Sequence, residues 1–222
     1  MSPFRDLCRI AAFTLVVRPV LRVVAGFRAT GLGNLPAAGP AVIAANHNSH
    51  LDGLALMSLY PNRMLARVRP VAAADHFLGP GIVGWLARTF LNLIAIDRSG
   101  QGAEAVLGPV REALAAGDIV IVFPEGTRGE PEVMTKFRRG ASVLADEFPD
   151  VPFVPVCLKG LGHVLPKGAR MLCFAPASAT VGPARTRRDD PSRPMAEALE
   201  ADIVAMSASS RPAPLAPTAN GE

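Results

Sequence analysis

The sequence predicts an α/β protein in which helices flank a central, mostly buried mixed sheet, preceded by an N-terminal amphipathic segment of two helices. Short apolar runs of strand length, such as Ala41–Ala45 and Phe153–Leu158, alternate with longer segments of helical character. Apolar runs without polar alternation are typical of strands covered on both faces. With 222 residues, 50% of them hydrophobic and 19% charged, the chain can bury a substantial core.

Glycine and proline set the expected element boundaries. After a turn-rich connector at 31–39, strands are expected at 41–45, 68–74, 93–96, 119–123, 153–158, 171–174 and 179–181. Helices are expected at 49–59, 82–90, 101–116, 137–147 and 195–206. The helix at 49–59 is ended by Pro61, and the helix at 101–116 stops at Gly117. Residues 207–222 are rich in Ser, Pro and Ala, which indicates a disordered tail.

The first 28 residues carry the whole positive surplus of the chain. The protein has 23 basic and 19 acidic residues, a net charge of +4, and residues 1–28 hold five arginines against Asp6 alone. Nearly every other position of this segment is apolar, and Pro19 is expected to begin the second of two helices, 4–17 and 19–28. A basic apolar hairpin of this kind suits the headgroup layer of a membrane. The alternative is two surface helices packed on the core.

The composition argues against several classes of protein. The longest apolar run of the N-terminal segment, Ile10–Val17, is far shorter than the roughly 18 residues of a membrane-spanning helix, and no signal-peptide cleavage site precedes the arginines after it. Three scattered cysteines predict neither a disulfide framework nor a zinc site. One Trp and one Tyr offer few platforms for base stacking, so nucleic-acid binding is not expected.

The strongest local signal is the sequence Asn46-His47-Asn48-Ser49-His50-Leu51-Asp52, which follows the expected strand 41–45 where open α/β sheets bind ligands. Across such a turn His47 can meet Asp52, whose carboxylate would orient the ring while the other ring nitrogen takes a proton from an alcohol. One alternative is a histidine that caps the helix or bonds a backbone carbonyl. Another is a zinc site made by His47, His50 and Asp52, for which no cysteine cluster supplies a fourth ligand.

A second signal, Phe123-Pro124-Glu125-Gly126-Thr127-Arg128-Gly129, follows the buried strand expected at 119–123. The glycines let backbone amides approach a ligand, Arg128 can bind a phosphate through two hydrogen bonds, and Thr127 adds a hydroxyl donor. The alternative is a simple turn in which Glu125 pairs with Arg128. Of the cations that follow, Lys136 and Arg139 fit a solvated charge run, and Arg138 is left open between such a run and the site.

Two weaker blocks complete the set. Asp97-Arg98 ends the strand expected at 93–96, where Arg98 is either half of a salt bridge or a second cation for the same phosphate. The apolar block Val151–Val156 is interpreted first as a core strand and second as a wall of an acyl-chain site.

In this order, the four blocks resemble the 1-acylglycerol-3-phosphate acyltransferases and related phospholipid acyltransferases. The resemblance rests on Asn46, His47 and Asp52, on Ile96-Asp97-Arg98, on Phe123 through Arg128 at six consecutive positions, and on Val151 through Val156. It covers roughly residues 30–165. The chain departs from the family pattern at Asn92, where glycine is usual, and at Gly129, where serine is frequent.

The resemblance implies transfer of an acyl chain from acyl-CoA or acyl-carrier protein to the hydroxyl of a lysophospholipid, most simply 1-acylglycerol 3-phosphate giving phosphatidic acid. It implies His47 as the base and Asp52 as its orienting partner. It places Glu125, Gly126, Thr127 and Arg128 in the phosphate site together with Arg98. It implies neither a metal nor a bound cofactor.

The resemblance also sets the expected organisation: membrane-associating helices at 1–28, an acyltransferase domain at 29–206 and the tail at 207–222. We expect peripheral or monotopic attachment to anionic lipids at the cytoplasmic face of the inner membrane. The alternatives are an acyltransferase for another lysolipid, a lipid ester or thioester hydrolase, and a lipid-binding module without activity. For a hydrolase, the chain lacks a G-x-S-x-G elbow and a cysteine placed with His47.

Overall fold

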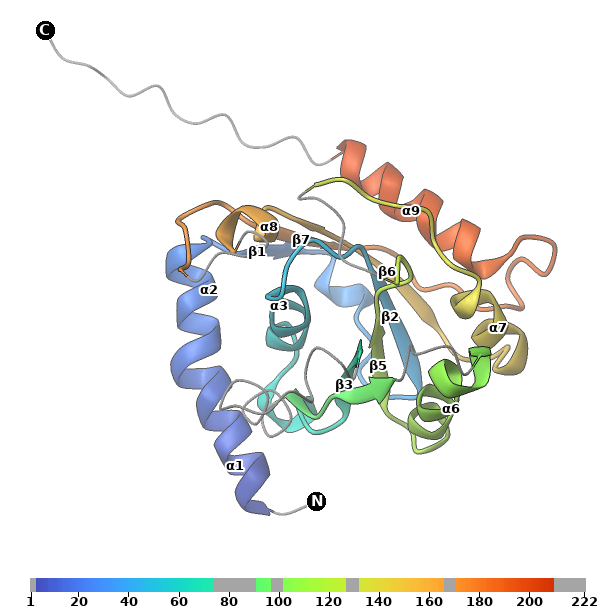
Figure 1. Ribbon diagram of the computed structural model, residues 1–222, viewed down its shortest axis with the longest axis horizontal. Coiled ribbons are helices and arrows are strands. Elements are labelled where there is room, and N and C mark those ends of the chain that lie inside the picture. The colour runs from blue at the N-terminus through green and yellow to red at the C-terminus, as the bar shows by residue number, and fades with distance from the viewer. Residues whose placement is uncertain (1–2, 74–90, 97–101, 127–131, 166–170, 210–222) are drawn as a thin grey trace, which may run out of the picture.

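A computed structural model describes residues 3–73, 91–96, 102–126, 132–165 and 171–209 of the chain (Figure 1). Within this part, seven strands form one sheet in the order β1-β7-β6-β2-β5-β3-β4. The strands are β1 (Arg28–Thr30), β2 (Ala41–Ala45), β3 (Val68–Ala73), β4 (Ile94–Ile96), β5 (Ile119–Val122), β6 (Phe153–Lys159) and β7 (Ser178–Val181). Neighbouring strands are parallel except for the antiparallel pair β6 and β7, so the predicted mixed α/β sheet is confirmed.

Helices cover both faces of this sheet, as Figure 1 shows, with α1, α2 and α3 on one side and α6, α7 and α9 on the other. The helices are α1 (Pro3–Ala12), α2 (Arg18–Val24), α3 (Asp52–Ser58), α6 (Gly102–Ala115), α7 (Gly140–Glu147), the short α8 (Leu161–Val164) and α9 (Met195–Ser209). Single-turn 3₁₀ segments lie at Leu32–Asn34 and Asn62–Met64. The expected helix at 82–90 lies outside the described residues.

Strand β2 shows why the buried runs have no polar alternation. All five of its residues are buried, because Val42 and Ala44 face the core under α6, α7 and α9 while Ile43 faces the core under α3. The neighbours of β2 are β5 and β6, both parallel to it. Residues just after β2 therefore emerge at the carboxyl edge of the sheet, between two parallel neighbours.

The N-terminal segment is helical as predicted, but it does not fold back as a hairpin. A π-helix at Phe13–Val17 joins α1 directly to α2, and Pro19 lies in the first turn of α2. Pro19 has no N–H to donate, and in a continuous α-helix its ring would meet the carbonyl of Leu15. The wider π-turn before Pro19 accommodates the ring while the chain stays helical. Phe13 and Leu21, on either side of this change, both reach the core.

Two other predictions, one for the N-terminal segment and one for residues 171–174, are wrong. The helix expected at 19–28 ends at Val24, since Gly26 has a φ of +47° and the N–H of Phe27 donates back to the carbonyl of Leu21. The chain then forms the edge strand β1 beside β7. The strand expected at 171–174 is absent: these residues are exposed, and the N–H of Cys173 donates to the carbonyl of Val164 instead of to a strand.

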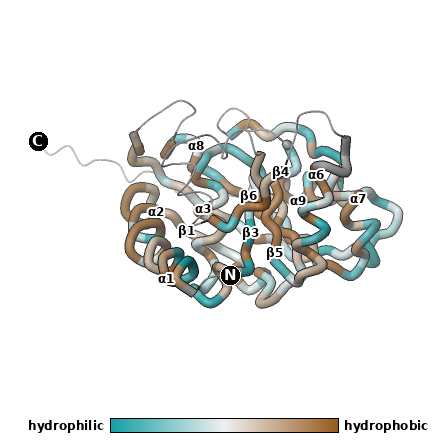
Figure 2. The backbone as a smooth tube through the Cα atoms, turned by 60° about the horizontal axis from the view of Figure 1, so that its bottom comes forward, coloured by the Kyte–Doolittle hydropathy of each residue, from teal (hydrophilic) through white to brown (hydrophobic). Residues whose placement is uncertain are grey.

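Hydrophobic residues also run along the outside of the molecule. Figure 2 shows brown segments along α1 and α2 as well as along the central strands. The exposed apolar side chains of these two helices and of the π-helix are Phe4, Leu7, Leu15, Val16 and Val23. No described helix combines the length and the hydropathy that crossing a bilayer requires.

Candidate active site

The candidate site lies in the segment between the end of β2 and the start of α3, residues 46–51. The side chain of Asn46 fixes the start of this segment: its amide donates to the carbonyl of Leu158 (2.8 Å) and accepts from the N–H of the same residue (2.7 Å). Through these two hydrogen bonds, the side chain of Asn46 extends the pairing of β2 with β6 beyond Ala45, the last residue of β2. The following residue, His47, is thereby held at the carboxyl edge of the sheet.

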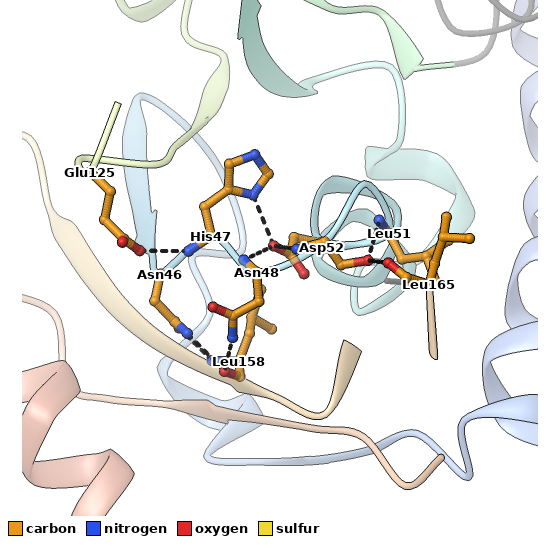
Figure 3. Close-up of polar contacts among 9 residues, drawn as sticks. Asn46, His47, Asn48, Leu51, Asp52, Glu125, Leu158 and Leu165 are labelled. Atoms are coloured by element: carbon orange, nitrogen blue, oxygen red, sulfur yellow. Dashed lines mark hydrogen bonds and ion pairs between the residues drawn. The ribbon is translucent and has the colours of Figure 1, made fainter. Parts of the chain in front are cut away.

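His47 and Asp52 form a close pair, as the sequence predicted. Nδ1 of His47 lies 2.8 Å from Oδ2 of Asp52, whose side chain is fully buried, while the His47 side chain is 20% exposed (Figure 3). The same carboxylate oxygen accepts the backbone N–H groups of Asn48 (2.7 Å) and Ser49 (2.8 Å). Three donors thus fix the carboxylate, and the carboxylate fixes the imidazole.

The second ring nitrogen of His47, Nε2, points away from Asp52 in Figure 3 and has no hydrogen-bond partner in the described part of the chain. Phe123, just beyond β5, stacks on the imidazole with ring centroids 4.1 Å apart and an interplanar angle of 19°. Asp52 therefore holds the ring at Nδ1 and Phe123 holds it by one face, which leaves Nε2 to contact a ligand. α3 has no side-chain cap, so His47 does not serve as the helix cap that the sequence left open.

Glu125 holds the backbone of His47 from the neighbouring strand. Its carboxylate is 3% exposed; Oε1 accepts the N–H of His47 (2.8 Å), and Oε2 accepts the N–H and the hydroxyl of Thr135 (2.8 and 2.9 Å). Sequence reasoning placed Glu125 in the phosphate site and did not single out Thr135. Both carboxylate oxygens are occupied by protein donors, which makes Glu125 a brace between His47 and the segment before α7.

Replacing Glu125 with Gln should weaken this brace. The glutamine oxygen can accept from His47, but its NH₂ group would face the N–H of Thr135, so the charge-assisted hydrogen bond between Thr135 and the carboxylate is lost, at about 1.5–3 kcal/mol. We expect the free energy of unfolding to fall by about that amount, as measured by urea denaturation. As a milder control, Thr135→Val removes only the hydroxyl bond, for about 1 kcal/mol. Equal stability of wild type and Glu125→Gln would show that the brace is unimportant.

Gly126 follows in a left-handed conformation, with a φ of +80°. A Cβ there would lie 2.5 Å from Nε of Arg138, whose guanidinium packs over the glycine and donates to the carbonyl of Glu125 (3.2 Å). The N–H of Gly126 donates to the carbonyl of Phe123 (3.0 Å) and so belongs to the turn itself. Arg138, which the sequence left open, thus lines the same cavity as His47.

The described residues outline a cavity of about 570 Å³ beside His47. The polar side chains in its described lining are those of His47, His50 and Arg138. The other described lining residues are apolar or glycine, and they include Val71 of β3, Leu107 and Val110 of α6, and Leu144 of α7. An apolar chain entering this cavity would place its polar end near His47.

Three of the predicted site residues, Arg98, Thr127 and Arg128, lie outside the described residues. None of the block Val151–Val156 appears among the described residues that line the cavity, and the side chains of Phe153, Val154 and Val156 are fully buried in β6. This block is therefore a core strand, the first of its two interpretations. Within the described residues, no group of three or more His, Cys, Asp or Glu side chains is placed to hold a metal ion.

Asn92, where the chain departs from the family pattern, has a φ of +47°. Glycine adopts this left-handed conformation freely, and asparagine is one of the few other residues that tolerate it. The side chain of Asn92 donates to the carbonyl of Ala66 (3.0 Å), and its own carbonyl accepts from Arg69 (3.3 Å). The substitution thus keeps the backbone geometry that a glycine would give.

Comparison with known proteins agrees with this geometry. A family model described as Acyltransferase matches residues 26–159. The 1-acyl-sn-glycerol-3-phosphate acyltransferase alpha of Homo sapiens is 36% identical over 132 residues, which cover 58% of this chain and 44% of the human protein. A 1-acyl-sn-glycerol-3-phosphate acyltransferase of Pseudomonas aeruginosa is 30% identical over 197 residues, covering 87% of this chain and 70% of that protein.

The fold is also found among solved structures. The crystal structure of the 1-acyl-sn-glycerophosphate acyltransferase from Thermotoga maritima superposes with a TM-score of 0.73 at 21% identity, covering 96% of this chain and 86% of that one. The matched region spans less than half the length of the mammalian relatives.

Proposed function

The chain belongs to the family of 1-acylglycerol-3-phosphate acyltransferases and related phospholipid acyltransferases, and on that premise we propose that it transfers an acyl chain from a thioester to the hydroxyl of a lysophospholipid. The observation that carries the proposal is the His47–Asp52 pair, whose histidine lines a largely apolar cavity. The names of the relatives favour 1-acylglycerol 3-phosphate as the acceptor and phosphatidic acid as the product.

In the proposed reaction, Nε2 of His47 accepts the proton of the lysolipid hydroxyl as the oxygen attacks the thioester carbonyl. A carbon–oxygen bond forms and the carbon–sulfur bond breaks. The imidazolium returns its proton to the departing thiolate, so the enzyme ends in its starting state. Buried Asp52 holds Nδ1 and stabilises the positive ring that exists between the two proton transfers.

The cations Arg98 and Arg128, with Thr127 and the turn at Gly126, stay our prediction for binding the acceptor phosphate. Arg138 is a further cation that lines the cavity together with His47. We assign Glu125 to the positioning of His47, because both of its oxygens already accept from protein donors. The acyl donor is either acyl-CoA or acyl-carrier protein, and no bound cofactor enters the proposed reaction.

A lysolipid acceptor and its product reside in a bilayer, so the proposed activity requires contact with a membrane. The exposed apolar side chains of α1, the π-helix and α2 supply a surface for peripheral or monotopic association, beside the arginines of residues 1–28. We assign the association to the cytoplasmic face of the inner membrane, the side from which a soluble thioester would reach the cavity. Truncation of 1–28 is a poor test, since Phe13, Leu21 and Ala25 are core residues.

Substitution of exposed residues is a cleaner test. Leu15 and Val23 are 72% and 70% exposed, so changing both to Asn should leave folding intact. If these side chains insert into the bilayer, each substitution should lower the affinity for anionic vesicles, measured by sedimentation, about tenfold. Burying such a side chain contributes roughly 1.5–3 kcal/mol. Val204→Asn on α9, across the sheet, is the matched control and should bind vesicles like wild type. Equal sedimentation of all variants would place the contact elsewhere.

The proposed reaction is tested directly by supplying labelled acyl-CoA or acyl-carrier protein with a panel of lysolipids and with glycerol 3-phosphate. We expect two-chain phospholipid to form fastest from 1-acylglycerol 3-phosphate. A preference for a lysolipid without a terminal phosphate would redirect the proposal to another acceptor.

A further inference from the structure

A second cavity, of about 600 Å³, lies between α2, the start of β1 and the C-terminal end of α3. Arg18, Arg22 and Arg28 all line it, and no carboxylate is among its described lining residues. Ser58 and Leu59 form its wall on the α3 side. It shares no described lining residue with the cavity at His47, which is at the opposite end of α3, about 10 Å away along the seven-residue helix.

Arg18 is fixed but not neutralised. Its Nε donates to the carbonyl of Ser58 (3.2 Å), Nη2 to the carbonyl of Tyr60 (2.6 Å) and Nη1 to the side-chain oxygen of Asn62 (2.6 Å). All three acceptors are uncharged. The guanidinium is therefore held in place with its full positive charge, as in a preformed anion site.

Arg22 and Arg28 add two exposed charges to the same cavity, and neither forms an ion pair within the described part of the chain. Like charges gathered around one cavity repel one another, so an anion there relieves the repulsion and gains charge-assisted hydrogen bonds. Guanidinium groups match phosphate oxygens in geometry, since they can donate two parallel N–H groups.

The surroundings of the cavity are apolar on two sides. Val23, next to Arg22, belongs to the exposed stripe of the N-terminal helices. Met171 and Phe174, each 79% exposed, precede β7, and the backbone of Ala177 bonds to Ala25 (2.8 Å) and Arg28 (3.2 Å). In Figure 1 this orange segment lies beside the C-terminal end of α2. Cations flanked by exposed apolar side chains suit the depth at which lipid phosphates lie.

From the three uncompensated arginines, and from the apolar side chains around them, we infer that this cavity binds the phosphate of an anionic phospholipid of the bilayer. Bound there, the lipid would fix the depth and orientation of α2 on the membrane while the cavity at His47 takes the substrates. The inference rests on the proposed function only in requiring a membrane surface.

The test compares single arginine substitutions in the full chain, by sedimentation with phosphatidylcholine vesicles that contain phosphatidylglycerol. R22Q and R28Q remove cavity arginines, whereas R5Q removes an exposed arginine of the same N-terminal helical segment outside the cavity. Loss of general attraction to an anionic surface should lower the vesicle affinity of any of the three variants about fivefold. We expect R22Q and R28Q to bind the vesicles at least about tenfold more weakly than R5Q, since each also loses charge-assisted hydrogen bonds to the lipid phosphate. Equal losses for all three variants would overturn the inference.

Two further arms separate the possible sources of the phosphate. Inorganic phosphate is titrated into the protein without vesicles: binding that R22Q abolishes, with R22Q and R5Q losing equal affinity for vesicles, would assign the cavity to a free ion and overturn the inference. In neutral detergent with dispersed lysolipid, R22Q should keep acyl transfer within about twofold of wild type. If R22Q instead loses acyl transfer in detergent but binds vesicles like wild type, the cavity would be assigned to the acceptor and the inference overturned. If wild type transfers no acyl chain, the proposed function fails, but the vesicle comparison still decides the site.

Discussion

Replacing His47 with Ala is expected to lower kcat for acyl transfer about 10²–10⁴-fold, the usual contribution of a positioned general base. The loss follows because, among the described side chains, only His47 both pairs with Asp52 and lines the cavity. The KM for the lysolipid should change little, because the proposed phosphate contacts come from arginines rather than from the imidazole. Purified protein, a quantified active fraction and a matched thermal unfolding temperature make the comparison valid.

His163→Ala is the control for this substitution. His163 lies on α8, is exposed, and is absent from the described lining of the cavity, so its removal should leave kcat unchanged. Near-full activity of His47→Ala would overturn the general-base mechanism outright, since His47 is the one described side chain that pairs with Asp52.

Replacing Asp52 with Asn should lower kcat at least about 10²-fold while keeping the chain folded. Asparagine is the informative choice, because its oxygen can still accept the N–H groups of Asn48 and Ser49 that the carboxylate holds. The neutral amide cannot stabilise an imidazolium, and its NH₂ group can favour the wrong tautomer of His47. Asp52→Ala would confuse the result, since each buried donor left unsatisfied costs about 1–3 kcal/mol.

The double variant His47→Ala/Asp52→Asn sharpens this prediction. If Asp52 acts only through His47, the double variant should be no slower than His47→Ala alone. Initial rates with a saturating thioester measure this directly. Losses that multiply would give Asp52 a role of its own and contradict the proposed pairing.

The fold could be predicted where local pattern and tertiary burial agree. Strand β2 was predicted residue for residue, because a fully buried parallel strand shows its length as an unbroken apolar run. The same criterion failed at Met171–Phe174, where an equally apolar run is exposed and joins no strand. Whether such a run is paired depends on what the rest of the chain places beside it, which composition does not encode.

The N-terminal segment shows the complementary limit. Pro19 was expected to separate two helices, yet a π-turn absorbs it, since the core contacts of Phe13 and Leu21 hold both sides of one continuous helical run. The helix end at Val24, in contrast, had a readable signal in Gly26. Local chemistry predicts where a helix stops more reliably than where it continues through a proline.

In the candidate site, too, contacts between residues close in sequence could be predicted and long-range contacts could not. His47 and Asp52 are five residues apart, so their contact follows from one turn between a strand and a helix. The brace formed by Glu125 joins residues 78 and 10 positions away, and no spacing rule anticipates it. The sequence assigned no role to Arg138, which stands among other cations. Its place in the site depends on the turn at Gly126, where the absence of a Cβ makes room for its guanidinium.

The most direct measurement of the central claim is the release of free thiol from the acyl donor with and without a lysolipid acceptor. Transfer predicts that wild type releases thiol only when 1-acylglycerol 3-phosphate is present, in step with two-chain product, and that His47→Ala releases almost none. Thiol release at the same rate without acceptor would instead identify a thioester hydrolase and contradict the proposed transfer.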